Sequence, residues 1–368
     1  MLRAAGQVKL ARFLIDYEMV RTYCCPMDRK AFILGGAGQI GYAAAWALAE
    51  AGWHIKVGSR RSNPAELWPS ELGVEGVTVD RADTATLSMA LGDGCDLLLD
   101  CAAFNAGHGR QLLSFADRIG SAIVISSIAV YVEAALRNAE GGPGQWRSLP
   151  IGFTEEHPTM CASPDSYASK KLALEQTLLS ADSFPVTILR PGAIYGPYSH
   201  YPREWFFVKR ALDGRPYRIL SYGGRSQFHT TAAVNLAELI RLAAEQPGSR
   251  ILNAGDPEPP SVQDIAEAIS SVLGHHAENV LIEGEPPGPA IGDTPFSAPG
   301  PVIMDMSKAV ALGYRPKARY ADAVESAVRW MVDSAAGRDW QEAFPYFYAN
   351  QGEEAFDYRA EDEWVARR

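Results

Sequence analysis

Short apolar runs alternate with helix-length segments along residues 30–192. The runs have the length and composition of buried strands, and a helical segment such as YAAAWALAEA, which starts at Tyr42, follows the first of them. Strands separated by helices form βαβ units with helices on both faces, so the pattern predicts an α/β fold, a Rossmann-type doubly wound parallel sheet. The predicted strands are 31–34, 54–59, 76–80, 96–104, 121–127, 185–192 and 250–256.

The regular alternation ends after Gly192, where Pro, Gly and aromatic residues crowd 195–228 and later 284–301. This change of pattern predicts a second, smaller C-terminal lobe that binds substrate. The expected domains are a Rossmann domain that binds the dinucleotide at 28–195, a substrate-binding lobe at 196–335 from which 250–256 returns to the main sheet, and an aromatic and acidic extension at 336–368.

The N-terminal segment 1–27 precedes the pattern and is expected to lie outside the fold. Asp16 and Glu18 interrupt its apolar stretch, which argues against a secretory signal. A transit peptide and a natural start at Met27 both remain open.

Composition and charge narrow the class of protein. The chain has 368 residues, with 34 Lys and Arg against 44 Asp and Glu, a net charge of -10. The acidic excess argues against nucleic acid as a partner, and no apolar run reaches the roughly 20 residues that a membrane span needs. The five cysteines lack metal-ligand or disulfide spacing. We therefore expect a cytoplasmic protein without a metal site, a nucleic-acid partner or a membrane partner.

A glycine-rich turn lies between the first strand and the first helix. Gly35, Gly38 and Gly41 would let the backbone turn tightly and approach a pyrophosphate, while the helix N-terminus offers free N–H groups. The turn therefore predicts a dinucleotide site, with Gln39 and Ile40 as further contacts.

Two arginines follow the second strand, where an NAD site usually has an acid for the ribose hydroxyl. Arg60 and Arg61, preceded by Ser59, suit a 2′-phosphate through charge-assisted bonds. NADP(H) is therefore favoured over NAD(H), although a solvated basic turn is the alternative. Asp80 ends the third strand and could meet the adenine, or be an exposed strand-end acid.

Tyr167 and Lys171 stand four residues apart in a helical segment and so share one face of it. A cation one turn away favours the phenolate, which lets a tyrosine exchange protons near neutral pH. A hydroxyl from a strand end would complete such a site, and Ser127 supplies it. Its neighbour Ser126 should point the other way, because strand side chains alternate.

The chain resembles the extended short-chain dehydrogenases/reductases of the NAD-dependent epimerase/dehydratase family over roughly residues 30–330. The resemblance implies that Ser127 holds the substrate oxygen, that Tyr167 is the acid/base and that Lys171 holds the nicotinamide ribose and lowers the tyrosine pKa. It further implies a homodimer, and cofactor contacts at Ala102, Ala103 and Pro191. The segments that carry it are GGAGQIG (35–41), DLLLDCAAF (96–104), VISSIAVY (124–131), YASKK (167–171) and LRPGAIYGP (189–197).

Three departures from the family pattern bear on the reaction. Ile128 and Ala129 stand where dehydratases of the family carry an Asp-Glu pair, which argues against elimination chemistry. Phe228 takes the place of an Arg that grips a sugar-nucleotide diphosphate, and Arg225 is three residues out of register. The arginines after the second strand replace the acid typical of epimerases.

Aromatic and polar residues near the strand ends and in the second lobe are the candidates for substrate binding, because aromatics with a few polar groups suit a flat or sugar-like ligand. Core packing is the alternative for each of them. The candidates are Phe104, Tyr131, Tyr195, His200, Trp205, Arg225 and His229.

These residues predict an NADP(H)-dependent oxidoreductase that transfers a hydride between nicotinamide and a secondary alcohol or ketone of a polar small molecule. The first alternative is a nucleotide-sugar or sugar epimerase with tightly bound NAD. The second is a non-catalytic NADP(H)-binding sensor.

Overall fold

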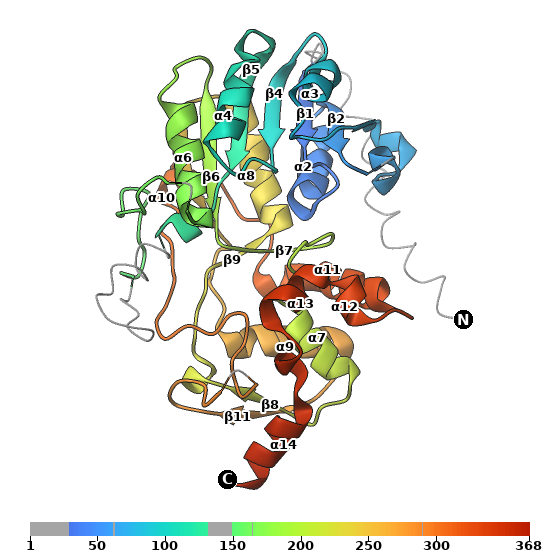
Figure 1. Ribbon diagram of the computed structural model, residues 1–368, viewed down its shortest axis with the longest axis vertical. Coiled ribbons are helices and arrows are strands. Elements are labelled where there is room, and N and C mark those ends of the chain that lie inside the picture. Colours follow the sequence, from blue (N-terminus) through green and yellow to red (C-terminus); the bar gives the residue numbers. More distant parts are fainter. Residues whose placement is uncertain (1–28, 62, 132–148, 164, 289) are drawn as a thin grey trace.

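Seven parallel strands form the central sheet, in the order β10-β6-β5-β4-β1-β2-β3 (Figure 1). Every predicted strand is present, which confirms the Rossmann-type fold. The order reverses between β1 and β4, and in such sheets ligands bind at the carboxyl ends of the strands beside this reversal. The strands are β1 (Lys30–Leu34), β2 (His54–Ser59), β3 (Glu75–Thr78), β4 (Cys95–Asp100), β5 (Ile119–Ile125), β6 (Val186–Pro191) and β10 (Arg250–Ala254).

The structure, a computed structural model, describes residues 29–61, 63–131, 149–163, 165–288 and 290–368. The predicted segment 1–27 lies outside the described residues. Within the described part of the chain, no helix is both long and apolar enough to span a membrane.

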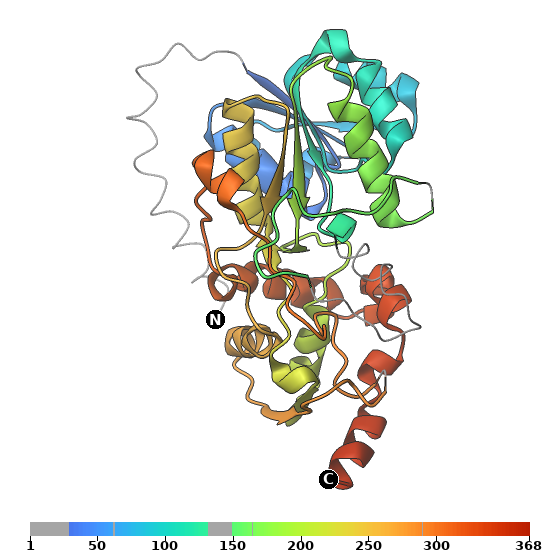
Figure 2. The same ribbon diagram turned by 90° about the vertical axis from the view of Figure 1, so that its left-hand side faces the viewer.

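Helices cover both faces of the sheet (Figure 2). Side chains of a strand alternate between the faces, so Ile33 of β1 enters one core cluster while Phe32 and Leu34 enter the other. The first cluster lies under α2 (Gln39–Glu50), α8 (Ala233–Glu245) and α10 (Ser307–Ala311), and the second under α3 (Thr84–Leu91), α4 (Ala106–Leu113) and α6 (Tyr167–Leu179).

Two helices of the predicted substrate-binding lobe, α8 and α10, pack on the central sheet instead. Leu236, Leu239 and Ile240 of α8 are fully buried against the α2 side of the sheet, and Ala309 of α10 joins them. The chain returns from the smaller lobe to the sheet before each of these helices. Their place in the sequence, within 196–335, therefore did not show that they pack on the sheet.

The smaller lobe lies below the carboxyl ends of the strands and is built around an aromatic core (Figure 1). The short strands β7 (Ala193–Tyr195) and β9 (Thr230–Ala232) pair in parallel at the junction between the lobes. Its other elements are α7 (Trp205–Leu212), β8 (Tyr217–Leu220), α9 (Val262–Leu273), β11 (Glu278–Leu281) and α11 (Tyr320–Ala335).

The C-terminal segment packs on the smaller lobe as the short helices α12 (Trp340–Ala343), α13 (Pro345–Gln351) and α14 (Tyr358–Ala366). Arg210 of α7 donates to Glu361 at 2.6 Å, and both side chains are buried. Phe347 is fully buried in the core of this lobe. The aromatic and acidic composition of the segment therefore serves docking against α7 and its surroundings.

Candidate functional site

The glycine-rich turn brings β1 and α2 into direct backbone contact. A Cβ on Gly41 would lie 2.5 Å from the Cα of Gly36 and 2.6 Å from the carbonyl oxygen of Gly35. Gly35 itself has φ +78°, in the left-handed region that favours glycine. These glycines are therefore required by the close approach of helix and turn.

The N-terminus of α2 is open to an anion. Its N-cap is Gly38, no side chain caps the helix, and its first turn has no acidic residue. Among the described residues, Oε1 of Gln39 is a buried oxygen without a hydrogen-bond partner. Free N–H groups and the positive end of the helix dipole suit a phosphate, so these residues fit the pyrophosphate of a dinucleotide.

A substitution pair tests this turn. Gly41→Ala is expected to abolish dinucleotide binding or folding, because its Cβ would overlap backbone atoms that cannot move aside. Gly38→Ala is the matched control for folding, since its Cβ would meet only the Gly35 oxygen, at 3.5 Å. Thermal unfolding should separate the two variants, and a Gly41→Ala protein with unchanged stability and dinucleotide binding would contradict the tight-turn geometry.

The end of β2 presents two guanidinium groups. Arg60 and Arg61 are exposed. The backbone that carries them is fixed, because Arg61 N donates to Ser59 Oγ at 3.1 Å and Thr78 Oγ1 donates to the Arg61 carbonyl at 3.2 Å. Asp80 is exposed and accepts from Ala82 N at 2.9 Å, as an acid does in a turn after a strand. The arginines thus lie on an ordered turn with their charges free to meet a ligand.

The predicted acid/base pair lies on the first turns of α6. Ser166 caps this helix by accepting from Ser169 N at 3.2 Å, so the helix begins at Tyr167. Tyr167 is 45% exposed, whereas Lys171 is 2% exposed. The ammonium lies 5.7 Å from the centre of the tyrosine ring. The structure therefore brings the charge close to the phenol while keeping the phenol accessible.

The buried ammonium of Lys171 is held by backbone carbonyls. It donates to Ala103 O at 2.6 Å and to Ile125 O at 2.7 Å, which ties α6 to the ends of β4 and β5. Burial lowers the pKa of Lys171 to about 8, and the nearby Asp100 carboxylate opposes the fall. At neutral pH the charged form still predominates, so the tyrosine has a cation beside it.

Ser127 follows β5 closely, two residues after the carbonyl that holds Lys171. Its side chain is half-buried and its Oγ accepts from Ala129 N at 3.1 Å. Ser126 points the other way and bonds Glu175 in the interior, as strand alternation predicts. Ser127 is thereby left as the hydroxyl on the side of the sheet end where a ligand could bind.

A buried polar network beneath these residues was missed by the sequence interpretation. Glu175 accepts from Ser126 and from Arg190, whose Nε lies 3.0 Å away. Arg190 Nη1 also donates to the Tyr131 hydroxyl at 2.6 Å, and that hydroxyl donates to Asn253 Oδ1 at 3.0 Å. One signal was available, because Glu175 is one helical turn beyond Lys171 in an otherwise apolar stretch.

Four of the seven predicted substrate contacts are core residues, and the expectation that they face the cleft is corrected. Tyr131 is fully buried, and burial raises its pKa to about 12. Tyr195 and Trp205 pack in the core of the smaller lobe. His229 is buried, with Nε2 donating to Asp256 O at 2.9 Å and Nδ1 accepting from Met304 N at 3.2 Å. Their aromatic and polar atoms are used within the protein.

The other three predicted contacts are exposed. The Phe104 ring lies 6.3 Å from the Tyr167 ring and beneath the Lys171 ammonium, so it belongs to the acid/base group. The His200 ring lies against the Tyr346 ring, with 4.4 Å between the ring centres and an angle of 32° between the ring planes. Arg225 instead pairs with Glu283 at 2.7 Å on the surface of the smaller lobe.

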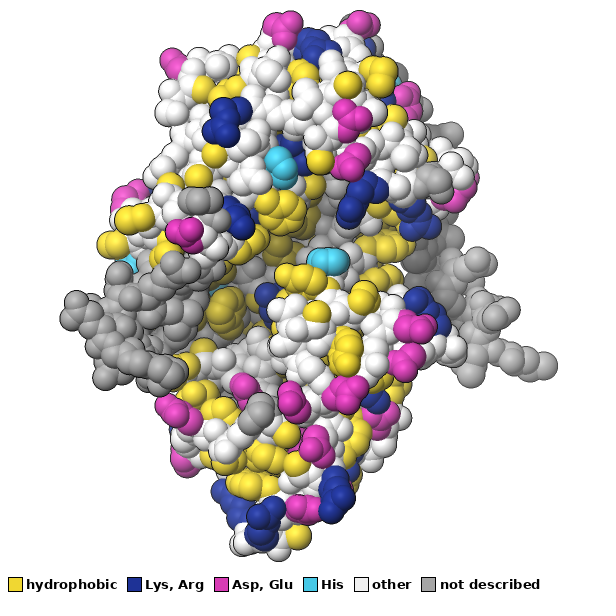
Figure 3. All heavy atoms as spheres, viewed as in Figure 1, with side chains coloured by type: hydrophobic (Ala, Val, Ile, Leu, Met, Phe, Trp, Pro, Cys, Tyr) yellow, Lys and Arg dark blue, Asp and Glu magenta, His cyan; other side chains and the backbone are white. Residues whose placement is uncertain are grey.

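Figure 3 shows a hollow between the two lobes, with hydrophobic side chains gathered along its walls. It lies at the level of the lobe junction, where the carboxyl ends of the strands meet the smaller lobe (Figure 1). Within the described ranges there is no group of three or more His, Cys, Asp or Glu that could hold a metal ion. The site therefore consists of an open helix N-terminus, two basic residues and a Ser-Tyr-Lys group.

Known structures share this architecture. At 20% identity and a TM-score of 0.62, a mutant UDP-glucuronic acid 4-epimerase from Bacillus cereus, in complex with UDP-4-deoxy-4-fluoro-glucuronic acid and NAD, matches 82% of this chain and 98% of its own. The dTDP-glucose 4,6-dehydratase of Bacillus anthracis in complex with NAD is 18% identical, with a TM-score of 0.63 over 85% of this chain and 98% of its own. The Bordetella bronchiseptica enzyme WbmH in complex with NAD+ is 17% identical, with a TM-score of 0.64 over 82% and 98%.

At these identities the likeness concerns the fold. No curated protein matches the chain. The sequence model of the NAD dependent epimerase/dehydratase family matches residues 31–255, which include the glycine-rich turn, Ser127, Tyr167 and Lys171. The chain therefore belongs to the NAD dependent epimerase/dehydratase family.

Proposed function

We propose that this enzyme is an NADP(H)-dependent oxidoreductase acting on a secondary alcohol or ketone of a polar small molecule. The observation that carries the proposal is the half-exposed Tyr167 beside the buried Lys171 ammonium at the carboxyl ends of the strands. A bound nicotinamide dinucleotide would supply or accept the hydride.

The chain's own residues would handle the substrate oxygen and its proton. Ser127 would donate a hydrogen bond to that oxygen, and Tyr167 would pass a proton to it or take one from it. Lys171 would favour the phenolate through its charge, because an ammonium nearby lowers the pKa of a phenol. The carbonyls of Ala103 and Ile125 fix the ammonium where it can act on the tyrosine.

The preference for NADP(H) is supported by the two arginines after β2. The double variant Arg60→Ala/Arg61→Ala is expected to weaken NADPH binding by at least about tenfold, since each charge-assisted bond to a phosphate contributes about 1.5 kcal/mol or more. NADH binding should change little, because NADH has no 2′-phosphate. Equilibrium titration with both cofactors checks this, and equal losses for the two would contradict a 2′-phosphate site.

An epimerase with bound NAD is the second candidate. It is supported by the similar structures, because the UDP-glucuronic acid 4-epimerase was solved with NAD. The same Tyr-Lys pair would take and return the proton of one alcohol, while a bound NAD would supply the hydride chemistry in both directions. An epimerase would invert a sugar carbon without added cofactor, which separates the two candidates. A homodimer and a cytoplasmic location also remain predictions.

A further inference from the structure

The segment 101–104 connects the end of β4 to the acid/base group. Its Ala103 carbonyl holds the Lys171 ammonium at 2.6 Å, and the next residue, Phe104, is 47% exposed beside Tyr167. It also lines the glycine-rich turn, since a Cβ on Gly35 would lie 3.3 Å from the Cβ of Cys101. This segment therefore supplies one of the two carbonyls that position the Lys171 ammonium, the other being that of Ile125.

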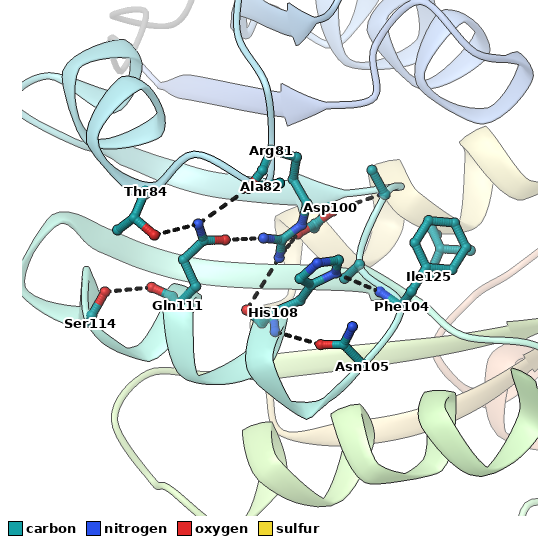
Figure 4. Close-up of polar contacts among 12 residues, drawn as sticks. Arg81, Ala82, Thr84, Asp100, Phe104, Asn105, His108, Gln111, Ser114 and Ile125 are labelled. Carbon is teal, nitrogen blue, oxygen red and sulfur yellow. Dashed lines mark hydrogen bonds and ion pairs between the residues drawn. The ribbon is translucent and has the colours of Figure 1, made fainter. Parts of the chain in front are cut away.

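One side of the segment is held by a buried ion pair (Figure 4). Asp100 is fully buried, and its Oδ1 accepts from Ala102 N at 2.8 Å. Its Oδ2 accepts from Arg81 Nη2 at 2.7 Å, and the same nitrogen donates to the His108 carbonyl at 3.2 Å. Gln111 of α4 bonds Arg81 in turn and anchors it to Thr84 through Nε2, at 2.9 Å. This half of the support is therefore an ion pair with its hydrogen bonds to the backbone and to Gln111.

The other side is held by an imidazole. His108, in the first turn of α4, accepts from Phe104 N through Nδ1 at 3.0 Å (Figure 4). Asn105 caps the helix by accepting from His108 N at 3.0 Å, which fixes the histidine backbone. A nitrogen that accepts a hydrogen bond carries no proton, so this contact exists only while the imidazole is neutral.

We propose that His108 is a positioning residue whose neutral imidazole holds Phe104 and the Ala103 carbonyl in place for Lys171, and that a proton gained at Nδ1 releases them. This inference rests on the proposed function for its catalytic consequence, although the contact itself does not.

The surroundings of the imidazole set the pH at which this happens. Burial lowers the pKa of His108, and the charged groups that face the ring are Arg81 from the loop before α3, Asp100 of β4 and Lys171 of α6. The two cations lower this pKa further, whereas the carboxylate raises it. The contact is thus complete above pH 6.5 and is lost as the pH falls through the lowered pKa.

Hydrogen exchange of the free protein tests the contact without any substrate. Corrected for the intrinsic exchange rate, protection of the Phe104 amide should fall between pH 7 and about pH 5 in the unsubstituted protein, in proportion to the share of His108 that gains a proton. His108→Asn places a non-titrating oxygen near the position of Nδ1 and should keep the amide protected at both pH values. His108→Ala should leave it unprotected at both, and His276→Asn, exposed on the other lobe, should behave like the unsubstituted protein.

NADPH binding over the same pH range gives the functional readout. We expect affinity to fall more steeply at low pH in the unsubstituted protein than in His108→Asn, because protonation of the 2′-phosphate weakens binding in both. Protection that does not depend on pH, or that falls equally in His108→Asn, would overturn the inference. If the amide behaves as expected but NADPH does not bind at either pH, the positioning contact stands and the proposed function fails.

Discussion

Tyr167→Phe is expected to lower kcat by about 10²- to 10⁴-fold, the usual contribution of a positioned acid/base group. The substitution removes only the hydroxyl of a side chain on a half-exposed residue, so packing should change little, and the Lys171 ammonium keeps its bonds to the carbonyls of Ala103 and Ile125. Cofactor affinity and unfolding should therefore remain close to those of the unsubstituted enzyme. The measurement is steady-state turnover on the substrate that a panel of polar ketones and alcohols identifies.

Tyr348→Phe is the matched control for the loss of one tyrosine hydroxyl. Its hydroxyl lies 3.3 Å from Glu353 in the C-terminal segment, away from the Ser-Tyr-Lys group. Its turnover should equal that of the unsubstituted enzyme. Full turnover by Tyr167→Phe itself would show that another group moves the proton.

Glu175→Ala is expected to destabilise the protein by about 3–5 kcal/mol, because it leaves the buried charge of Arg190 without a partner. Both side chains of this pair are at most 3% exposed. The loss also removes the acceptor of the Ser126 hydroxyl, one residue before Ser127. Denaturant unfolding measures the change directly.

The surface pair of Arg329 and Glu325 provides the comparison. These side chains are 69% and 54% exposed on α11, so Glu325→Ala should cost no more than about 0.5 kcal/mol. Replacing both Glu175 and Arg190 with apolar residues should recover part of the loss, since no unpaired charge remains. A loss below 1 kcal/mol for Glu175→Ala would contradict its role as the anchor between α6, β5 and β6.

The central strands of the sheet could be predicted because they are buried on both faces. Runs such as the one that ends at Leu34 are continuously apolar and too short for a helix, so their length and composition identify them as strands without tertiary information. The glycine-rich turn and the Tyr167 to Lys171 spacing were equally local, since each lies within one turn or one helix. These patterns therefore sufficed for the fold and for the acid/base group.

The buried polar residues could not be predicted in the same way. Arg190 lies in the LRPGAIYGP segment, where the sequence alone does not distinguish a surface arginine from a buried one. The structure shows that it is 2% exposed and bonded to Glu175 and Tyr131. Trp205 and His229 are residue types that often line ligand sites, but the same residue types also fill the core of a lobe. Which side of a helix or strand faces the cleft depends on the packing of the smaller lobe, and that information is not local.

The cofactor content and requirement of the purified enzyme test NADP(H)-dependent hydride transfer most directly. We expect protein purified without added cofactor to bind NADPH at least tenfold more tightly than NADH, and to consume one NADPH for each ketone reduced. The opposite result is protein that releases one equivalent of NAD+ on unfolding and epimerises a sugar substrate with no cofactor added. That result would contradict NADP(H)-dependent hydride transfer to a ketone.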